Sequence, residues 1–411
     1  MLQDIFQIIL KSAENAFLQV TVFVGAVLLI FGYINYKKSG AFIEGIEKSK
    51  KWQPIIGALL GLSPGCGGAI FVMPLFVKGS VSYGTVIATL IATMGDSAFV
   101  IISTLPLHYA LVSIISFIAA IITGYLVDYF KIGDILLSRI KKLSKEERNE
   151  IHSKADHMLL NMECKDNVNC HIGHEEGDEV DLALHHKAKG HQKLETIGYK
   201  FTHKGFLFYW VMISLGLVLG IMLLFQVDVN SFSIPNLGSI IGVFGTILSI
   251  AMMLMGKKFI QDDTHEETEL KSMSLKETLI HNAQETAFVA TWVFVAYLIY
   301  EVGVYGLGGG NYAAGEELMK GFMSSAGLLA VIVGALIGLI PGCGPQVIFV
   351  ALFTKGMVPF AALLANAISQ DGDALFPLLA IDRKSSLWAT VITTVPALIL
   401  GVIVYFIEIN I

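Results

Sequence analysis

Two copies of a short motif place a cysteine between glycines in the middle of apolar stretches: Pro64-Gly65-Cys66-Gly67 and Pro341-Gly342-Cys343-Gly344. Proline removes one helical hydrogen bond and glycine permits non-helical dihedral angles, so each motif is predicted to break its helix. Backbone groups freed inside a membrane are tolerated where they face protein, water or a ligand, and they can coordinate an ion. The motifs therefore predict a transport site that contains Gly65, Cys66, Gly342 and Cys343. The alternative is a packing kink in which cysteine acts as a small apolar residue.

A pair of acidic residues accompanies the motifs. Asp96 and Asp373 each follow a glycine in the apolar stretch after the motif. A carboxylate deep in a bilayer costs about 2.5 kcal/mol or more, so such residues normally pair with a cation, a proton or another helix. Further oxygen ligands surround the second copy, at Asn366, Gln370 and Asp371. We expect these residues to belong to the transport site; the alternative is that both aspartates lie at a membrane boundary and are solvated.

The chain repeats itself at an offset of 277 residues. An ungapped shift over residues 61–99 gives 16 identities in 39 positions, which include the cysteine motif and the Gly-Asp pair. Internal duplication is typical of secondary transporters, whose site lies at the repeat interface. We predict a first membrane repeat at 1–130 and a second at 285–411, about four helices each. Between them we place a polar loop at 131–205, two linking helices at 206–256 and an acidic loop at 257–284.

The composition excludes a water-soluble enzyme and a nucleic-acid-binding protein with one anchor. Of the 411 residues 54% are hydrophobic and 15% charged, with a mean hydropathy of +0.67. Apolar runs predict an all-α polytopic membrane protein with ten spans, whose broken helices carry the cysteine motifs. The spans are expected at about 16–36, 54–77, 82–105, 108–127, 206–226, 235–256, 286–305, 322–353, 357–380 and 387–407. Counting Lys and Arg on each side predicts both termini and the 131–205 loop in the cytoplasm. Whether the repeats are parallel or inverted depends on whether the motif segments span the membrane or re-enter it.

A histidine-rich segment in the long polar loop is a second candidate for metal binding. Its thiols and imidazoles favour zinc-like metals, and its many carboxylates suit harder ions such as manganese. The spacing matches no standard zinc finger, so a solvated acidic linker is an equal alternative. The candidate ligands are Cys164, Cys170, His171, His174, His185 and His186.

A third, weaker pair of acidic residues lies at the expected entrances of the first and seventh spans. Glu14 is followed by Asn-Ala-Phe and Glu285 by Thr-Ala-Phe. A glutamate in the first turn of a helix is stabilised by the helix dipole without any function. A role in proton or cation entry is the alternative.

The whole chain resembles the ten-transmembrane-helix heavy-metal exporter family. The resemblance rests on the paired Pro-Gly-Cys-Gly motifs, the paired Gly-Asp elements, the ten-span count and the histidine-rich central loop. This group is arsenic-permease-like and is also labelled as manganese transporters. The resemblance implies efflux of a metal or metalloid across the cell membrane.

The chain contains no nucleotide-binding motif, so transport must use an ion gradient or run downhill. We expect a secondary exporter of a divalent cation, with no cofactor, no enzymatic activity and no nucleic-acid partner. Oxygen-rich surroundings favour manganese, whereas two thiols would suit zinc or cadmium. Proton exchange is expected to drive export. The alternatives are a permease for arsenicals or sulfur oxyanions, which would need basic residues or helix N-termini, and an intramembrane thiol enzyme.

Overall fold

The computed structural model describes residues 2–48, 51–77, 79–133, 196–225, 235–259, 264–340 and 342–410, and residues 180, 183–184, 227 and 229–230. Within these residues the chain is helical and contains no β-strand. Among them, seven helices are long and apolar enough to cross a membrane. The all-α, multi-span membrane architecture expected from composition is thus confirmed.

The amino-terminal helix is longer than the apolar run alone suggests. Helix α1 (Leu2–Asn15) continues through a π-helical turn (Ala16–Thr21) into α2 (Val22–Lys48). The candidate span is therefore Gln3–Tyr33 rather than 16–36. Burial of Phe17 and Leu18 fixes the π-helical turn against the linking helices.

Two segments fold into the same succession of helices. In the first, the elements are α3 (Gln53–Gly61), α4 (Gly67–Val77), α5 (Tyr83–Ala92), α6 (Ser97–Thr104) and α7 (Pro106–Tyr129). In the second, they are α15 (Tyr312–Gly338), α16 (Gly344–Thr354), α17 (Phe360–Ser369), a 3-10 turn (Gly372–Ala374), α18 (Leu375–Ile381) and α19 (Arg383–Asn410). Adding 277 to the bounds of α4 and α5 reproduces those of α16 and α17.

Four of the ten expected spans are not single helices. The runs at 54–77, 82–105, 322–353 and 357–380 are each divided into two shorter helices. The first and third divide at the cysteine motifs. The second divides at Gly95-Asp96, between α5 and α6, and the fourth divides at Gly372-Asp373. The breaks at the Gly-Asp pairs were not expected from the sequence. The glycines have φ of +52° and +54°, a left-handed conformation that ends a helix.

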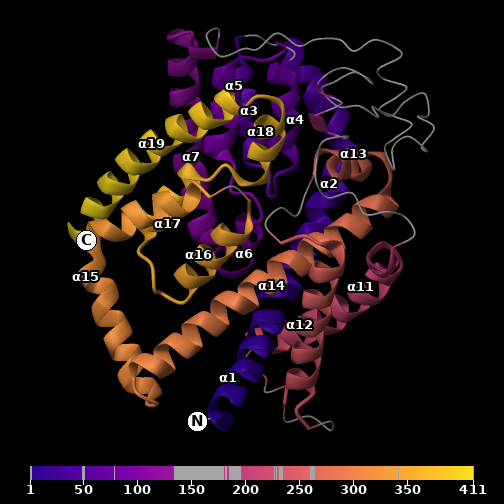
Figure 1. Cartoon of the computed structure of the whole chain (residues 1–411), viewed down its shortest axis with the longest axis vertical. Helices are drawn as coiled ribbons and strands as arrows, with labels where there is room; N and C mark the ends of the chain where they lie inside the picture. Colours follow the sequence, from indigo (N-terminus) through magenta and orange to yellow (C-terminus); the bar gives the residue numbers. More distant parts are fainter. Residues whose placement is uncertain are drawn as a thin grey trace.

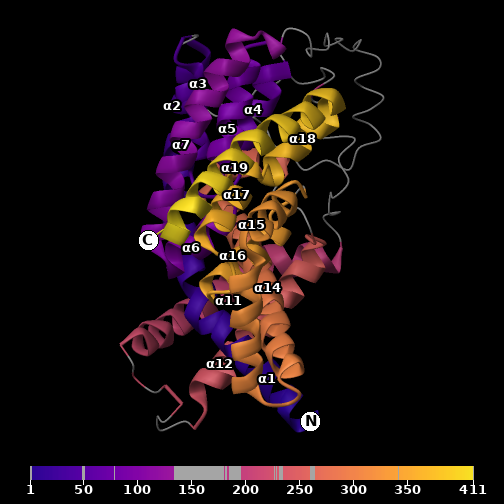
Figure 2. The same ribbon diagram turned by 90° about the vertical axis from the view of Figure 1, so that its left-hand side faces the viewer.

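Between these segments the described part of the chain forms four further helices: α11 (Ile197–Leu224), α12 (Leu237–Gly256), α13 (His265–Met273) and α14 (Leu275–Leu307). The 33-residue α14 crosses the molecule diagonally (Figure 1) and contacts α2, α11, α12, α13, α15 and α16. Turning the molecule shows α7 and α19 along its outer side (Figure 2). Their outward residues are apolar at helical spacing, as in Leu107, Leu111, Ile114 and Ile118 and in Leu387, Val391, Val395 and Ile399. Such apolar faces suit contact with lipid.

Candidate functional site

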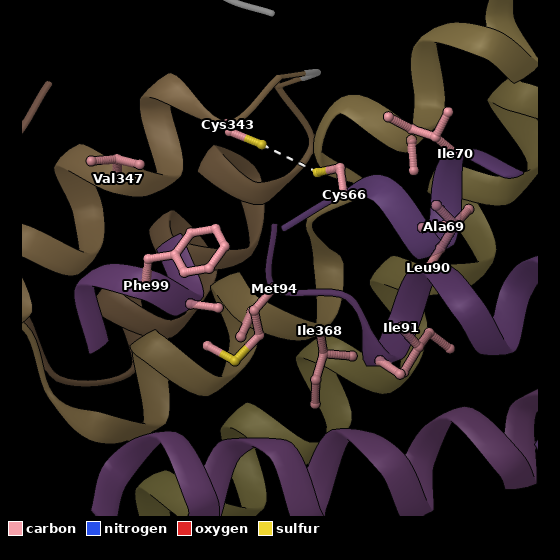
Figure 3. Close-up of a cluster of buried hydrophobic side chains, with 14 of the residues drawn as sticks. Cys66, Ala69, Ile70, Leu90, Ile91, Met94, Phe99, Cys343, Val347 and Ile368 are labelled. Atoms are coloured by element: carbon pink, nitrogen blue, oxygen red, sulfur yellow. Dashed lines mark hydrogen bonds between the residues drawn. The ribbon is translucent and has the colours of Figure 1, made fainter. Parts of the chain in front are cut away.

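The two motif cysteines meet in the interior of the protein. The Sγ atoms of Cys66 and Cys343 lie 3.4 Å apart, and each residue is 2% exposed. Neither forms a disulfide bond with a described residue. Figure 3 shows the sulfurs facing each other while α4 and α16 lead away from them in opposite directions. The structure therefore brings together the residues that carried the sequence prediction.

Asp96 completes a group of three potential ligands. A carboxylate oxygen of Asp96 and the two sulfurs all lie within 4.8 Å of one another. Asp96 is 1% exposed, so the prediction of a solvated boundary carboxylate is not supported. It occupies the N-cap position of α6, where the positive end of the helix stabilises negative charge. Two sulfurs and one carboxylate form an incomplete tetrahedral donor set of the kind that zinc-like metals use.

Glycines allow the backbone to approach the sulfurs. A Cβ atom on Gly95 would lie 2.9 Å from Cys343 Sγ and 3.1 Å from Cys66 Sγ. A Cβ atom on Gly372 would lie 2.9 Å from Cys66 Sγ. Since Cβ atoms do not approach sulfur so closely, only glycine fits at either position without movement.

Each motif is tied to the Gly-Asp break of its own segment. Gly65 donates its N–H to Gly95 O at 3.2 Å, and Gly342 donates to Gly372 O at 3.3 Å. Both donors have positive φ, +84° and +102°. The freed backbone groups of one break are thus satisfied by the other, which explains why both breaks occur together inside an apolar protein.

Asp373 occupies a different position from Asp96. Its backbone N–H donates to Cys66 Sγ at 3.3 Å, and the residue is fully buried. Its carboxylate is not part of the close group formed by Asp96 and the cysteines. Neighbouring Asp371 accepts from Thr390 Oγ1 at 2.7 Å and Thr393 Oγ1 at 3.4 Å, so it is directed at α19. The acidic cluster of the second copy therefore divides between two environments.

The two amides of the second copy serve different contacts. Gln370 donates to Thr93 O at 3.3 Å and lies 3.5 Å from Ser97 Oγ, which joins the two segments beside the sulfur pair. Asn366 donates to Gly334 O at 3.0 Å and fastens α17 to α15. The structure thus places Gln370 at the site and Asn366 at a helix contact.

Three helix N-termini converge on the sulfurs. Helix α4 begins directly after Cys66, α16 has Cys343 as its N-cap, and α6 has Asp96 as its N-cap. The positive ends of these dipoles favour negative charge where they meet. They would compensate for burying negative charge on these groups, and they would also favour a bound anion.

Glu285 approaches the first motif from α14. Its Oε1 lies 3.4 Å from the position of a Cβ on Gly65, and its Oε2 accepts from Lys271 Nζ at 2.8 Å. Because α14 begins at Leu275, Glu285 is not in the first turn, and the helix-dipole explanation does not apply. Sequence reasoning missed this approach to Gly65.

Glu14 lies elsewhere, near the end of α1. It accepts hydrogen bonds from Asn230 and Ser239 and lines a pocket with Asn15 and Glu301. It too is outside the first turn of its helix, and the structure does not place it with Glu285.

Gln346 is a residue that the sequence analysis overlooked. It is 1% exposed and donates to Ile340 O at 3.1 Å, which steadies the backbone before the second cysteine. An amide two residues after the Pro-Gly-Cys-Gly motif in an apolar run was the available signal. The loop ligands lie outside the described residues: Cys164, Cys170, His171, His174, His185 and His186.

No curated protein and no solved structure matches the chain. A family model does match it, over residues 4–408, which include every element of the site. On this match the chain belongs to the family described as "Putative, 10TM heavy-metal exporter".

Proposed function

We propose that this protein is a secondary transporter that exports a divalent heavy-metal cation through the Cys66–Cys343 site. The observation that carries the proposal is the 3.4 Å separation of two buried sulfurs beside the Asp96 carboxylate. Thiolate and carboxylate groups bind divalent metals, and a buried, incomplete donor set leaves a position for a transient ligand. Membership of a heavy-metal exporter family supports the same conclusion.

The donor set favours zinc-like metals. Two thiols suit zinc or cadmium, whereas manganese prefers carboxylate and carbonyl oxygens. Manganese, which the oxygen-rich sequence around Asp371 favours, remains a candidate because Asp373 and Gln370 are close by in the fold. We rank zinc and cadmium first and manganese second, because Asp371 is bonded to α19 and Asp96 is the one carboxylate among the described residues that joins the sulfurs.

Proton exchange would supply the driving force. An inside-negative potential opposes outward movement of a divalent cation by about 2.3 kcal/mol per charge per 100 mV. The buried carboxylates Asp96 and Asp373 could alternate between metal and protons, with Glu285 beside Gly65 as a further carrier. Entry of at least two protons for each ion would balance the charge.

Transport by the purified protein in proteoliposomes tests this function. Zinc, cadmium and manganese are offered separately, and their movement is followed with a metal-sensitive dye inside the vesicles. We expect zinc or cadmium transport that Cys66→Ser or Cys343→Ser reduces at least tenfold. The matched control is Cys164→Ser with Cys170→Ser, which removes two thiols but leaves the central pair. Equal activity of the central and the loop variants would contradict the proposal.

The convergent helix N-termini favour a second candidate, a permease for arsenicals or sulfur oxyanions. Two thiols can bind trivalent arsenic, and the helix ends can hold an anion. The two candidates differ in their need for Asp96. Replacement by asparagine removes a cation ligand, but it relieves repulsion of an anion. Cation transport should therefore fall in Asp96→Asn, whereas oxyanion transport should be kept or rise. A thiol enzyme has no comparable support, since the family is one of exporters.

A further inference from the structure

A second group of potential metal ligands lies where α11 and α14 meet, apart from the cysteines. His203 comes from the first turns of α11, and Glu277 and His281 come from the first turns of α14. One ligand atom from each lies within 4.8 Å of the others. We propose that these three side chains bind a divalent transition-metal cation. This site does not depend on the function proposed for the sulfur pair.

The burial of His281 points to a missing ligand. The residue is 2% exposed, and neither ring nitrogen has a hydrogen-bond partner among the described residues. Glu277 Oε2 is 3.8 Å from its Nε2 and Glu267 Oε1 is 3.8 Å from its Nδ1, both too far for a hydrogen bond. Buried polar atoms are nearly always satisfied, and one that is not calls for an explanation such as an ion.

His203 is oriented as a metal ligand would be. Its Nδ1 lies 3.0 Å from Thr202 Oγ1 and 3.2 Å from Tyr199 O, and the ring stacks on Tyr199 with centroids 3.7 Å apart. The Thr202 hydroxyl donates to backbone carbonyls of the preceding turn, so it can accept from Nδ1–H. When Nδ1 donates to these oxygens, Nε2 carries the free lone pair, and this Nε2 is buried without a hydrogen-bond partner among the described residues. A histidine that binds a metal through one ring nitrogen usually donates a hydrogen bond from the other ring nitrogen, and this bond fixes the tautomer.

The geometry assigns the ligand atoms as Nε2 of His203, Nε2 of His281 and a carboxylate oxygen of Glu277. In a tetrahedral site with bonds of about 2.0–2.2 Å, neighbouring ligand atoms are about 3.3–3.6 Å apart, so the group needs to close by up to about 1.5 Å. Two imidazoles and one carboxylate are a donor set used by zinc. Glu267 would accept the Nδ1–H of His281 from the side opposite the metal.

The surrounding charges permit a cation here. Lys258 and Lys271 approach the cluster, but each is paired with a carboxylate: Lys258 with Glu267 at 3.1 Å and Lys271 with Glu285 at 2.8 Å. Lys276 lies on the same helix, next to Glu277. The Glu277 carboxylate therefore remains to balance the charge of the ion.

Glu277, His281 and Glu285 follow one another at intervals of four residues on α14, so they share one helix face. Glu285 also reaches Gly65 of the first motif. An ion held by His281 would thus be one helical turn from the residue that borders the sulfur site.

Cobalt(II) binding to the full-length protein in detergent tests the proposal. In the background variant the loop histidines are replaced by glutamine and both loop cysteines are replaced by serine. The same variant carries Cys66→Ser and Cys343→Ser. Without thiols, a histidine and carboxylate site gives visible d–d bands but no sulfur-to-cobalt charge-transfer band. We expect this background to bind one cobalt ion. Failure of the sulfur site to transport metal would leave this result unchanged.

Single substitutions identify the ligands. His203→Gln and Glu277→Gln are each expected to weaken cobalt binding about tenfold or more, within the range for disturbed metal sites. The matched control is His108→Gln, because His108 packs on Phe353 and Phe360 instead. Size-exclusion profiles and metal-free melting temperatures identify variants that fold. No cobalt binding by the background, or unchanged binding in both variants, would overturn the proposal.

Discussion

The sulfur atoms of Cys66 and Cys343 lie 3.4 Å apart although 277 residues separate them in the chain. The same offset separates Gln370 from Thr93, the residue whose carbonyl it contacts. Two contacts between equivalent positions mean that an approximate twofold axis passes between the segments at this point. Figure 3 shows α4 and α16 leaving the sulfurs in opposite directions, as expected for helices related by such an axis.

The sulfur pair should be open to bridging by one reagent. A trivalent arsenical such as phenylarsine oxide binds two neighbouring thiols, and the Cys66–Cys343 separation suits it. Proteolysis within residues 134–195 would then leave the two fragments joined on a denaturing gel without reductant. Cys66→Ser in a background without Cys164 and Cys170 serves as the control. Fragments that separate after treatment would show that the sulfurs do not meet.

Gly95→Ala should abolish metal binding at the sulfur site. Its added Cβ would lie 2.9 Å from Cys343 Sγ, whereas a Cβ on Gly79 would meet no described atom within 4 Å. Both glycines have positive φ, so each substitution carries a conformational cost of about 1–2 kcal/mol. Calorimetric cadmium titration should show that Gly95→Ala has lost the sulfur-site binding and that Gly79→Ala keeps it nearly unchanged. Similar binding by the two variants would argue against the sulfur site.

Asp96→Asn should reduce cadmium affinity more than Asp373→Asn. The Asp96 carboxylate belongs to the group with both sulfurs, while Asp373 contacts Cys66 through its backbone N–H, which asparagine keeps. We expect a loss of about tenfold or more for Asp96→Asn, equivalent to about 1.4 kcal/mol. Titration of both purified variants gives the comparison, and an equal loss would remove the distinction between the two aspartates.

Asp373→Asn should nevertheless remove transport more completely than deletion of 163–186. A fully buried carboxylate in the translocation region is suited to carry a proton, whereas the loop can only raise the local metal concentration or regulate. Initial rates in proteoliposomes of the two variants test this order. Greater loss from the deletion would assign the loop an essential role.

A pH gradient should drive metal transport. If protons and metal compete for the carboxylates, an opposing gradient accelerates metal movement and a protonophore abolishes the acceleration. Asp96→Asn should lose this dependence together with its affinity. Transport by the purified protein that ignores both the gradient and the protonophore would leave a uniporter or another counter-ion.

Much of the architecture could be predicted because it depends on local pattern. Apolar runs long enough to cross a bilayer predicted a helical membrane protein, and the Pro-Gly pairs in two of these runs predicted broken helices at the cysteine motifs. In the structure the helices before the motifs end at Gly61 and Gly338. The identity of 16 residues over 61–99 marked the cysteines and the Gly-Asp pairs as belonging together. These features require only neighbouring residues or a comparison of the chain with itself.

Contacts between distant segments could not be predicted in this way. The local pattern does not distinguish Asp96, Asp371 and Asp373 from one another. In the structure the Asp96 carboxylate lies near the sulfurs, Asp373 contacts Cys66 through its backbone N–H, and the Asp371 carboxylate is bonded to α19. The same holds for Glu285 beside Gly65 and for His203 beside His281. Sequence alone determined which residues can ligate or titrate, because that is a property of each side chain. Only the tertiary structure decided which of them share a site, because helix packing sets the position of each side chain relative to segments hundreds of residues away.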